Sequence, residues 1–393
     1  MRDFSVELPQ GREPWLVPLA TRLAEFLAVG SDRRRVVYVY DAPNTSSFRY
    51  RVYNVKQWLD GSRICVSYFY RYELDVVTEH LLKADLIILA RSQWTLSYQR
   101  LIDLAKMRHL PVWFDTDDLI CCLDSLQLIT NTLNVALDNE EAYSFWCAMI
   151  GRGEMVARQA DGFLVTNAYL GECLSRRFGG KPFRVIENSL NREQLEISAA
   201  VSGRKQSYPG DDEFLIGYFS GTPSHINDFR IVAPELMQVL EDFPQAKLVV
   251  VGFMEFPPEM NRLIKEGRIV FRPLVDFMEL QVKMAEVDIS IVPLVENEFT
   301  NCKSELKFFE GAVVDTVTLA SPIHTYAHSI RHGETGFLCR PGEWYRTIAD
   351  IIGGKYDLKR MVAQAKRECL ERYAGEGFVK SAVSVLGSDV SRV

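Results

Sequence analysis

The sequence lacks several features that would point to particular classes of protein. Its 393 residues contain no apolar run near the ~20 residues of a membrane-spanning helix, and the start MRDFSVELPQ has no apolar stretch behind a basic end, so we expect neither a membrane span nor a signal peptide. The eight cysteines form no CxxC pair and no cluster with histidine, which predicts reduced thiols and no structural zinc site. The net charge of −7 disfavours a nucleic-acid partner. These absences favour a protein of the cytoplasm.

What the sequence does have is a globular composition and repeated short apolar runs. Hydrophobic residues make up 47% and charged residues 25%, values typical of a folded protein, and the length allows two domains. Segments of helical length and period separate the apolar runs, which predicts βαβ units and parallel sheets. The runs lie at 35–40, 64–69, 85–90, 111–114, 162–166 and 184–187, and then at 214–219, 247–251, 268–271, 288–292 and 317–320.

The alternation stops at SAAVSGRKQSYPGDD (198–212), a small and polar stretch that is typical of a linker. We therefore predict an α/β fold of two Rossmann-like, doubly wound domains facing across a cleft, with an N-terminal domain over 1–195 and a C-terminal domain over 196–369. A long helical region from about 358 to 386 follows, and the end of the chain, about 370–393, is expected to complete the N-terminal domain. Ligands of such sheets bind at the carboxyl ends of the strands.

An acidic loop follows one predicted strand in WFDTDDLI (113–120), where Asp115-x-Asp117 is followed at once by Asp118. Carboxylates at this spacing can hold Mg²⁺ or Mn²⁺ against a diphosphate. They can equally accept hydrogen bonds from sugar hydroxyls, act as a general base or cap the next turn. The family resemblance given below implies a nucleotide on the opposite side of the cleft, so we predict Asp115 and Asp117 to be catalytic, sugar-contacting residues and predict no metal site.

A second candidate site lies in LIGYFSGTPSHINDF (215–229), where a predicted strand runs into a loop of small residues before a helix. Such a loop can present backbone N–H groups to an anion at the helix N-terminus. Gly221, Thr222 and His225 are therefore candidates for ligand binding. The fuller GxGxxG pattern is missing, and an ordinary strand-to-helix turn is the alternative.

A third candidate site lies in PLVENEFTNCKSELKFFEGA (293–312), also after a predicted strand. Lys303, Lys307 and Glu310 are spaced by four and three residues, so they should share one helical face. The lysines could offset the charge of a diphosphate, and the carboxylate could accept from both ribose hydroxyls. A solvated helix with internal ion pairs is the alternative.

Two arginines follow the first predicted strand in SSFRYRVYN (46–54). A guanidinium at a strand's carboxyl end fits an anionic acceptor, such as a lipid-linked diphosphate, or the phosphates of a nucleotide. Arg49 and Arg51 are therefore predicted to bind an acceptor or a phosphate. Ion pairing at the surface is the alternative.

Several of these motifs, taken in order along the chain, resemble the group 1 glycosyltransferases. The C-terminal half of these enzymes, which have the GT-B fold, is similar to three stretches: IGYFSGTPSHINDF, FTNCKSELKFFEGA and HGETGFL (332–338). The resemblance is to enzymes like those of glycosyltransferase family 4. SSFRYRVYN, FDTDDL, ADGFLVTNAYL and RVIENSLN resemble the N-terminal half of a bacterial polysaccharide and cell-envelope branch. The resemblance covers nearly the whole chain.

The resemblance implies an enzyme that moves a sugar from a nucleotide-diphosphate sugar to a polysaccharide, glycolipid or glycoprotein acceptor. It implies no metal or other cofactor, retention at the anomeric carbon, and a cytoplasmic location with the option of peripheral contact at the inner face of the cell membrane. The matching positions imply donor binding by Glu310 at the ribose, by Lys307 in a K-x-x-E pattern, by Gly221 and Thr222 in the phosphate loop, and by Asn188 in the turn that ends the first sheet.

The sequence also departs from the family. The first Glu of the E-x7-E motif would fall at Cys302, and the arginine and lysine that usually grip the diphosphate are absent from SGTPSHIND. Asp315 and Val317 stand where G-x-P is usual. Lys303 or Lys307 is expected to supply the missing charge. Three alternatives stay open: a catalytically degenerate binding subunit, a metal-dependent transferase that uses Asp115-x-Asp117, and an epimerase of the same fold.

Overall fold

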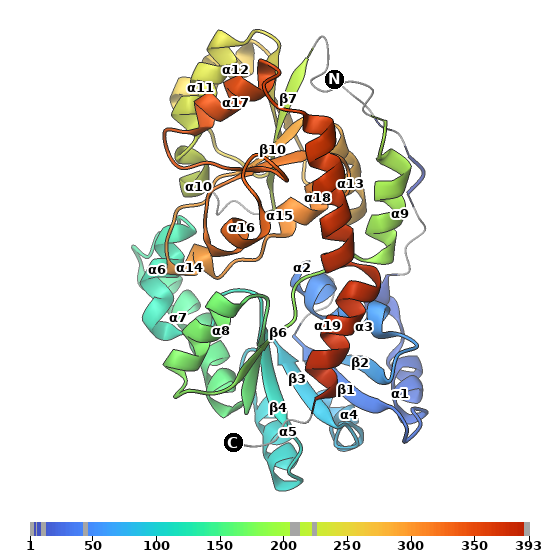
Figure 1. Ribbon diagram of the computed structural model, residues 1–393. Helices are drawn as coiled ribbons and strands as arrows, with labels where there is room; N and C mark the ends of the chain where they lie inside the picture. The colour runs from blue at the N-terminus through green and yellow to red at the C-terminus, as the bar shows by residue number, and fades with distance from the viewer. Residues whose placement is uncertain are drawn as a thin grey trace.

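Two α/β domains, each built on a six-stranded parallel sheet, lie one above the other (Figure 1). The computed structural model describes residues 4, 6–8, 13–41, 46–204, 213–221 and 226–388, and the fold is given for these residues. Within them, no helix combines the length and the apolar character needed to cross a bilayer.

The N-terminal sheet has the strand order β2-β1-β3-β4-β5-β6. Its central strands are buried along most of their length. Helices cover both faces of the sheet, and the continuous apolar runs supply apolar side chains to each face. The chain order reverses between β1 and β3, which is where open α/β sheets bind ligands. The strands are β1 (Arg34–Tyr40), β2 (Ile64–Tyr70), β3 (Leu86–Ala90), β4 (Val112–Thr116), β5 (Gly162–Val165) and β6 (Phe183–Val185).

The helices of this domain begin where the sequence offers a cap. The side chains of Thr95, Asn139, Asn167 and Asn191 each accept a hydrogen bond from a backbone N–H in the first turn of the helix that follows. The helices are α1 (Leu19–Leu27), α2 (Ser46–Phe48), a π-helical turn (Arg49–Tyr53), α3 (Asn54–Leu59), α4 (Leu74–Leu81), α5 (Leu96–Met107), α6 (Leu126–Thr132), α7 (Glu140–Gln159), α8 (Ala168–Arg177) and α9 (Arg192–Val201).

The C-terminal sheet has the order β12-β11-β10-β7-β8-β9, and its chain order reverses between β7 and β10. Its strands are β7 (Phe214–Ser220), β8 (Ala246–Gly252), β9 (Ile269–Arg272), β10 (Ile289–Val292), β11 (Val317–Ala320) and β12 (Phe337–Leu338). The apolar runs predicted all of these strands except β12, whose two residues are too few for a pattern. The helices are α10 (Ile226–Arg230), α11 (Ala233–Asp242), α12 (Asn261–Lys265), α13 (Phe277–Ala285), α14 (Glu298–Asn301), α15 (Leu306–Ala312), α16 (His324–Ser329) and α17 (Trp344–Ile352).

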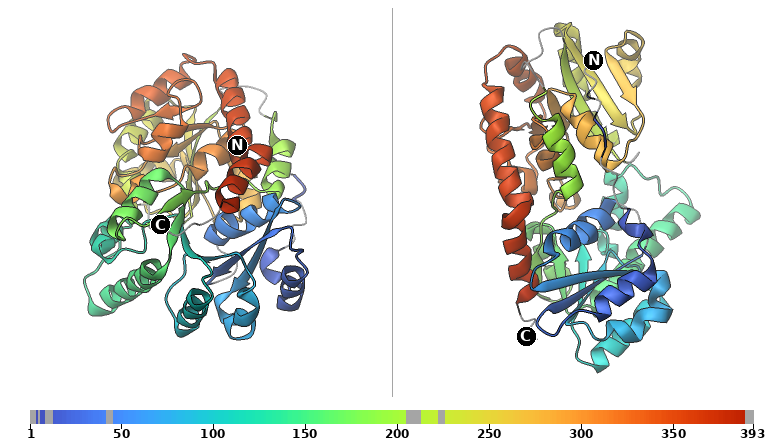
Figure 2. Two further views of the ribbon diagram at one scale, coloured as in Figure 1. Left: turned by 60° about the horizontal axis from the view of Figure 1, so that its bottom comes forward. Right: turned by 90° about the vertical axis from the view of Figure 1, so that its right-hand side faces the viewer.

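Helices near the domain boundary pack on both domains. The predicted closing helix is interrupted, because Ala374 takes an extended conformation between α18 (Leu358–Tyr373) and α19 (Gly375–Gly387). α18 packs on the C-terminal domain, whereas Phe378 and Leu386 of α19 enter the core of the N-terminal sheet. In the right-hand view of Figure 2 these helices run down one side of the molecule past both domains. α9 packs against α13 of the C-terminal domain, and most of the predicted linker, 205–212, lies outside the described residues.

Candidate functional site

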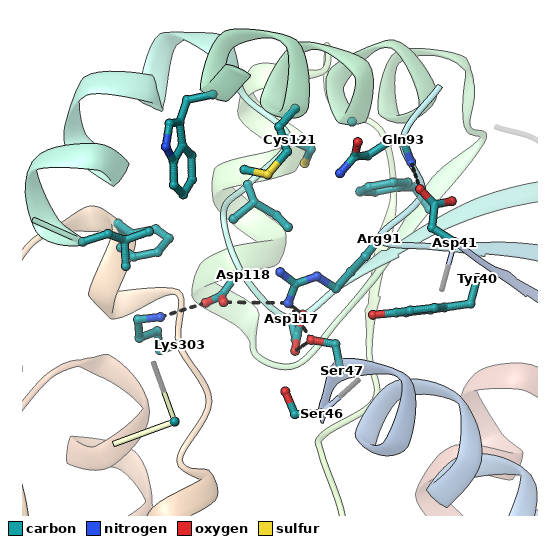
Figure 3. A pocket seen from close by; sticks show the side chains of 18 of the residues that line it. Tyr40, Asp41, Ser46, Ser47, Arg91, Gln93, Asp117, Asp118, Cys121 and Lys303 are labelled. Carbon is teal, nitrogen blue, oxygen red and sulfur yellow. Dashed lines mark hydrogen bonds and ion pairs between the residues drawn. The ribbon is translucent and has the colours of Figure 1, made fainter. Parts of the chain in front are cut away.

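A pocket of about 630 Å³ lies between the carboxyl ends of the two sheets (Figure 3). Residues that follow β1, β3 and β4 line it from the N-terminal domain, together with side chains of α7. From the C-terminal domain it is lined by Gly221, Phe299, Lys303 and Leu306. The pocket therefore joins the ligand-binding ends of both sheets, as the predicted fold requires.

Two smaller pockets adjoin it. The first, of about 170 Å³, shares Asp117, Asp118 and Lys303 with the large pocket and is also lined by Lys307. The second, of about 110 Å³, shares Gly221 with the large pocket and includes Lys307 and Glu310. The structure thus brings together four residues that the sequence predicted as donor-binding: Gly221, Lys303, Lys307 and Glu310.

Asp115 and Arg51 form a buried ion pair beneath the site. The guanidinium donates to both carboxylate oxygens at 2.9 and 2.8 Å, and neither residue is exposed at all. Burial raises the pKa of Asp115 above its ordinary value, although the charge of Arg51 acts in the opposite direction. The predicted direct contacts of Asp115 with sugar and of Arg51 with an acceptor therefore need correction, because each residue satisfies the other and neither lines a pocket described above.

Asn188 extends this pair towards the other domain. Its side-chain oxygen accepts from Arg51 at 3.1 Å, and its Nδ2 donates to Ser304 at 3.0 Å in the C-terminal domain. Because Asn188 is only 1% exposed and does not line these pockets, the predicted donor contact is also corrected. Asn188 instead holds the turn between α14 and α15 against the N-terminal domain.

Asp117 and Asp118 face the large pocket and each pairs with a cation (Figure 3). Arg91 Nη1 lies 2.6 Å from Asp117 Oδ1 and donates to Ser47 Oγ at 2.7 Å. Lys303 Nζ lies 3.3 Å from Asp118 Oδ1, so this ion pair joins the two domains. Burial by itself would raise the pKa of Asp117. The nearby positive charges, above all that of Arg91, outweigh this effect and hold the pKa below its ordinary value. Asp117 is therefore a carboxylate that is available to accept hydrogen bonds.

Arg91 is a functional candidate to which the sequence gave only low weight. It follows β3 directly, and its φ of 48° is unusual for a residue other than glycine. This backbone conformation turns the chain just past the strand, and the guanidinium reaches the pocket. The available signal was its position at a strand's carboxyl end, next to the switch point between β1 and β3.

Glu310 and Lys307 lie on α15, and Lys303 does not. The prediction that all three share one helical face is wrong, because α15 begins at Leu306 and Lys303 lies in the turn before it. Glu310 is 4% exposed, accepts from Tyr50 Oη of the N-terminal domain and lies 3.4 Å from Gln194 Nε2. Burial raises the pKa of Glu310 to about 7 and lowers that of Lys307 to about 8.

Arg49 packs on the C-terminal domain. Its guanidinium carbon lies 3.4 Å from the centre of the Phe277 ring at the start of α13, and burial lowers its pKa. Arg49 lines none of the three pockets described above and makes an interdomain stacking contact, so its predicted acceptor or phosphate contact stays a prediction. Thr222 and His225 lie outside the described residues, so their predicted roles stay predictions.

Comparison with known proteins agrees with this architecture. Residues 214–354 match the family model described as Glycosyl transferases group 1. No curated protein matches the chain. Among solved structures, HepE of Anabaena in complex with UDP is 15% identical, with 90% of this chain and 100% of that chain covered and a TM-score of 0.61.

Two further structures show the same likeness. A glycosyltransferase from Rickettsia africae is 14% identical, covers 90% of this chain and 98% of its own, and has a TM-score of 0.57. Sucrose-phosphate synthase from Thermosynechococcus elongatus is 16% identical, with 90% of this chain and 97% of that chain covered and a TM-score of 0.57. The predicted fold of two Rossmann-like domains is confirmed. By its C-terminal group 1 domain, set in a GT-B fold, the protein is a glycosyltransferase enzyme.

Proposed function

We propose that this protein transfers a sugar from a nucleotide-diphosphate sugar to a hydroxyl of a polysaccharide, glycolipid or glycoprotein acceptor. The observation that carries the proposal is the set of adjoining pockets between the two sheets. One brings Gly221 and Glu310 together with Lys307, and the next brings Lys307 together with Asp117. A transferase needs this arrangement, because the donor and the acceptor must meet in one place from which water is excluded.

The nucleotide is expected at the C-terminal end of these pockets. Glu310 can accept from the ribose hydroxyls, and Lys303 and Lys307 can offset the diphosphate charge. HepE, the structural neighbour described above, was solved with UDP and with UDP-glucose, so a UDP-sugar is the first donor to test. Tyr50 now donates to Glu310, and the ribose would take its place.

The chemical step needs charge stabilisation at the leaving phosphate. The acceptor oxygen bonds to the anomeric carbon, the bond from that carbon to the diphosphate oxygen breaks, and its electron pair leaves with the diphosphate. The acceptor proton passes to the leaving phosphate oxygen when the configuration is retained. Lys303 and Lys307 stabilise the growing negative charge. Asp117, as a hydrogen-bond acceptor at the shared boundary of the pockets, orients a sugar hydroxyl.

The ion pairs of the acidic loop support a reaction without a metal. Asp115 faces Arg51, Asp117 faces Arg91 and Asp118 faces Lys303, so each carboxylate already has a cationic partner. A divalent ion would have to displace these partners. This disfavours a metal-dependent transferase built on Asp115-x-Asp117.

A catalytically degenerate binding subunit is the second candidate, and one observation favours it. Cys302, which stands where the family's first Glu would fall, is fully buried in the core of the N-terminal domain. Its side chain cannot replace that carboxylate at a donor. Binding of nucleotide without turnover would support this candidate.

The test measures nucleotide binding and donor turnover separately. Calorimetric titration with UDP should show binding, and Lys307→Met should weaken it about tenfold or more because a charge-assisted contact is lost. Lys265→Met, on the exposed helix α12, is the matched control and should bind as the wild type does. Release of UDP from UDP-sugars should persist in EDTA. Loss of turnover in EDTA would refute the metal-free reaction, and no binding to any nucleoside diphosphate would refute the donor site.

A further inference from the structure

The large pocket has a polar part and an apolar part. Its polar lining comes mainly from the N-terminal domain, namely from Asp41, Ser47, Arg91, Gln93, Asp117 and Asp118. In Figure 3 Arg91, Asp117 and Asp118 lie between Ser46 and Ser47 on one side and Cys121 on the other. Its apolar lining is formed by Ile120, Leu133, Trp146, Met149, Phe299 and Leu306. An occupant that satisfies both parts must itself have a polar and an apolar part.

The polar part has no spare positive charge. Among the described residues that line the pocket, Arg91 and Lys303 are the cations, and they pair with Asp117 and Asp118. Asp41 adds a third carboxylate, which accepts from Tyr98 Oη at 2.5 Å and from the backbone N–H of Gln93 at 3.2 Å. Carboxylates with free lone pairs attract hydroxyl donors and repel anions. The polar part therefore suits an uncharged, hydroxyl-rich group such as a sugar.

The apolar part continues out of the pocket along α7. Phe145 precedes Met149 by four residues, so both lie on the same side of the helix. Phe145 is 63% exposed and packs edge to face on Trp146, which lines the pocket. Tyr143, one turn before Trp146, is 48% exposed. The apolar wall of the pocket thus reaches an aromatic surface at its rim, which a purely polar saccharide would leave in water.

We propose that the acceptor is an uncharged sugar joined to an apolar group, bound with its sugar at Asp117 and Asp118 and its apolar group along Trp146 and Met149 towards Phe145. This assignment rests on the proposed function, because the sugar end of the pocket shares Asp117, Asp118 and Lys303 with the pocket expected to hold the donor. It selects a glycolipid among the three acceptor classes. It also replaces the anionic acceptor that the sequence suggested at Arg49 and Arg51.

The test compares acceptor probes that differ only in their apolar part. Methyl, hexyl and octyl β-D-glucopyranoside are titrated calorimetrically into the full chain below the concentrations at which they form micelles. Affinity should rise with chain length by up to about fourfold per methylene, which corresponds to about 0.8 kcal/mol for each buried methylene. Equal affinity for the methyl and octyl probes, or no binding of the octyl probe, would overturn the proposal.

Two substitutions on one helix localise the effect. Met149→Gln places a polar side chain of similar size in the apolar wall and should abolish most of the gain from methyl to octyl. Met155→Gln makes the same change at a position of α7 that is 44% exposed and outside the pocket, and it should keep the gain. Equal loss, or equal retention, in both variants would overturn the assigned location.

UDP binding is measured on the same samples. If UDP binds and Met149→Gln leaves its affinity unchanged, the variant is folded and the effect belongs to the acceptor side. Failure of the wild type to bind UDP or any other nucleoside diphosphate would refute the donor site of the proposed function and leave the chain-length result to decide the acceptor class. The two ideas can therefore fail separately.

Discussion

Replacing Glu310 with glutamine should stabilise the protein at high pH while it weakens nucleotide binding. Glu310 is 4% exposed, and burial raises its pKa from 4.5 to about 7. Between these two pH values the folded protein holds a proton that the unfolded chain releases. The free energy of unfolding therefore keeps its full value below pH 4.5 and decreases as the pH rises towards about 7.

The magnitude follows from the pKa difference. At about 1.36 kcal/mol for each pKa unit, the rise from 4.5 to about 7 corresponds to about 3 kcal/mol. Glutamine is neutral at every pH, so it avoids this penalty. The variant also loses the attraction between Glu310 and Lys307 and offers Tyr50 a weaker acceptor, which offsets part of the gain. We expect the variant to be more stable than the wild type by about 1–3 kcal/mol at pH 8 and to match it within about 1 kcal/mol at pH 5.

The assay is urea unfolding of both proteins at pH 5 and pH 8. Taking the difference between variant and wild type at each pH cancels the other titrating groups. UDP affinity at pH 8 should fall about tenfold or more in the variant, since a hydrogen bond to a charged group contributes ~1.5–3 kcal/mol. Glu266→Gln, where the carboxylate is 45% exposed, is the control and should change neither quantity.

Two outcomes would refute different parts of this reasoning. A stability difference that is the same at pH 5 and pH 8 would show that burial does not control the protonation of Glu310. Unchanged UDP affinity in a variant that shows the stability effect would remove Glu310 from the ribose site. The first result concerns the folded protein alone, and the second concerns the proposed function.

Three further predictions address the ion pairs and the lysines. Asp115→Ala should lower the free energy of unfolding by ~3–5 kcal/mol, because it leaves the buried guanidinium of Arg51 unpaired. Adding Arg51→Met to this variant should restore a substantial part of the lost stability. If urea unfolding shows no such gain in the double variant, the pairing is contradicted. Lys303→Ala should lower the free energy of unfolding by less than ~1 kcal/mol, since its partner Asp118 is 23% exposed, and should weaken UDP binding several-fold. Equal losses in the free energy of unfolding and in the free energy of UDP binding would point to a structural role. UDP affinity should decrease as the pH rises through about 8, where Lys307 loses its charge, and this dependence should be much weaker in Lys307→Met.

The sequence predicted the fold well because its signals are local. Continuous apolar runs such as 86–90 are buried on both faces, so each run marks a central strand without reference to the rest of the chain. The interruption at Ala374 was missed although a local signal marks it. Gly375, with a φ of 58°, and Gly377 follow Ala374 directly, and glycine at a positive φ commonly ends a helix. Beyond this break the chain leaves the C-terminal domain and packs on the N-terminal sheet.

The site was predicted only in part, and the errors share a cause. Gly221, Lys303, Lys307 and Glu310 follow strands at the carboxyl ends of one sheet, so topology alone brings them together. Whether such a residue faces the cavity depends on what it contacts. Arg49 and Arg51 also follow a strand, yet one stacks on Phe277 and the other is fully buried against Asp115.

The acidic loop WFDTDDLI shows that the cations beside a carboxylate determine whether it can bind a metal ion. Its carboxylates could be read from the sequence, but the cations that face them are 64 residues before Asp115, 26 before Asp117 and 185 after Asp118. A carboxylate beside a guanidinium has little affinity left for a divalent ion, whereas the same carboxylate alone would be a good ligand. We therefore propose that three cations brought in from distant segments make this loop a brace that fixes Arg51, orients Arg91 in the pocket and links the two domains through Lys303.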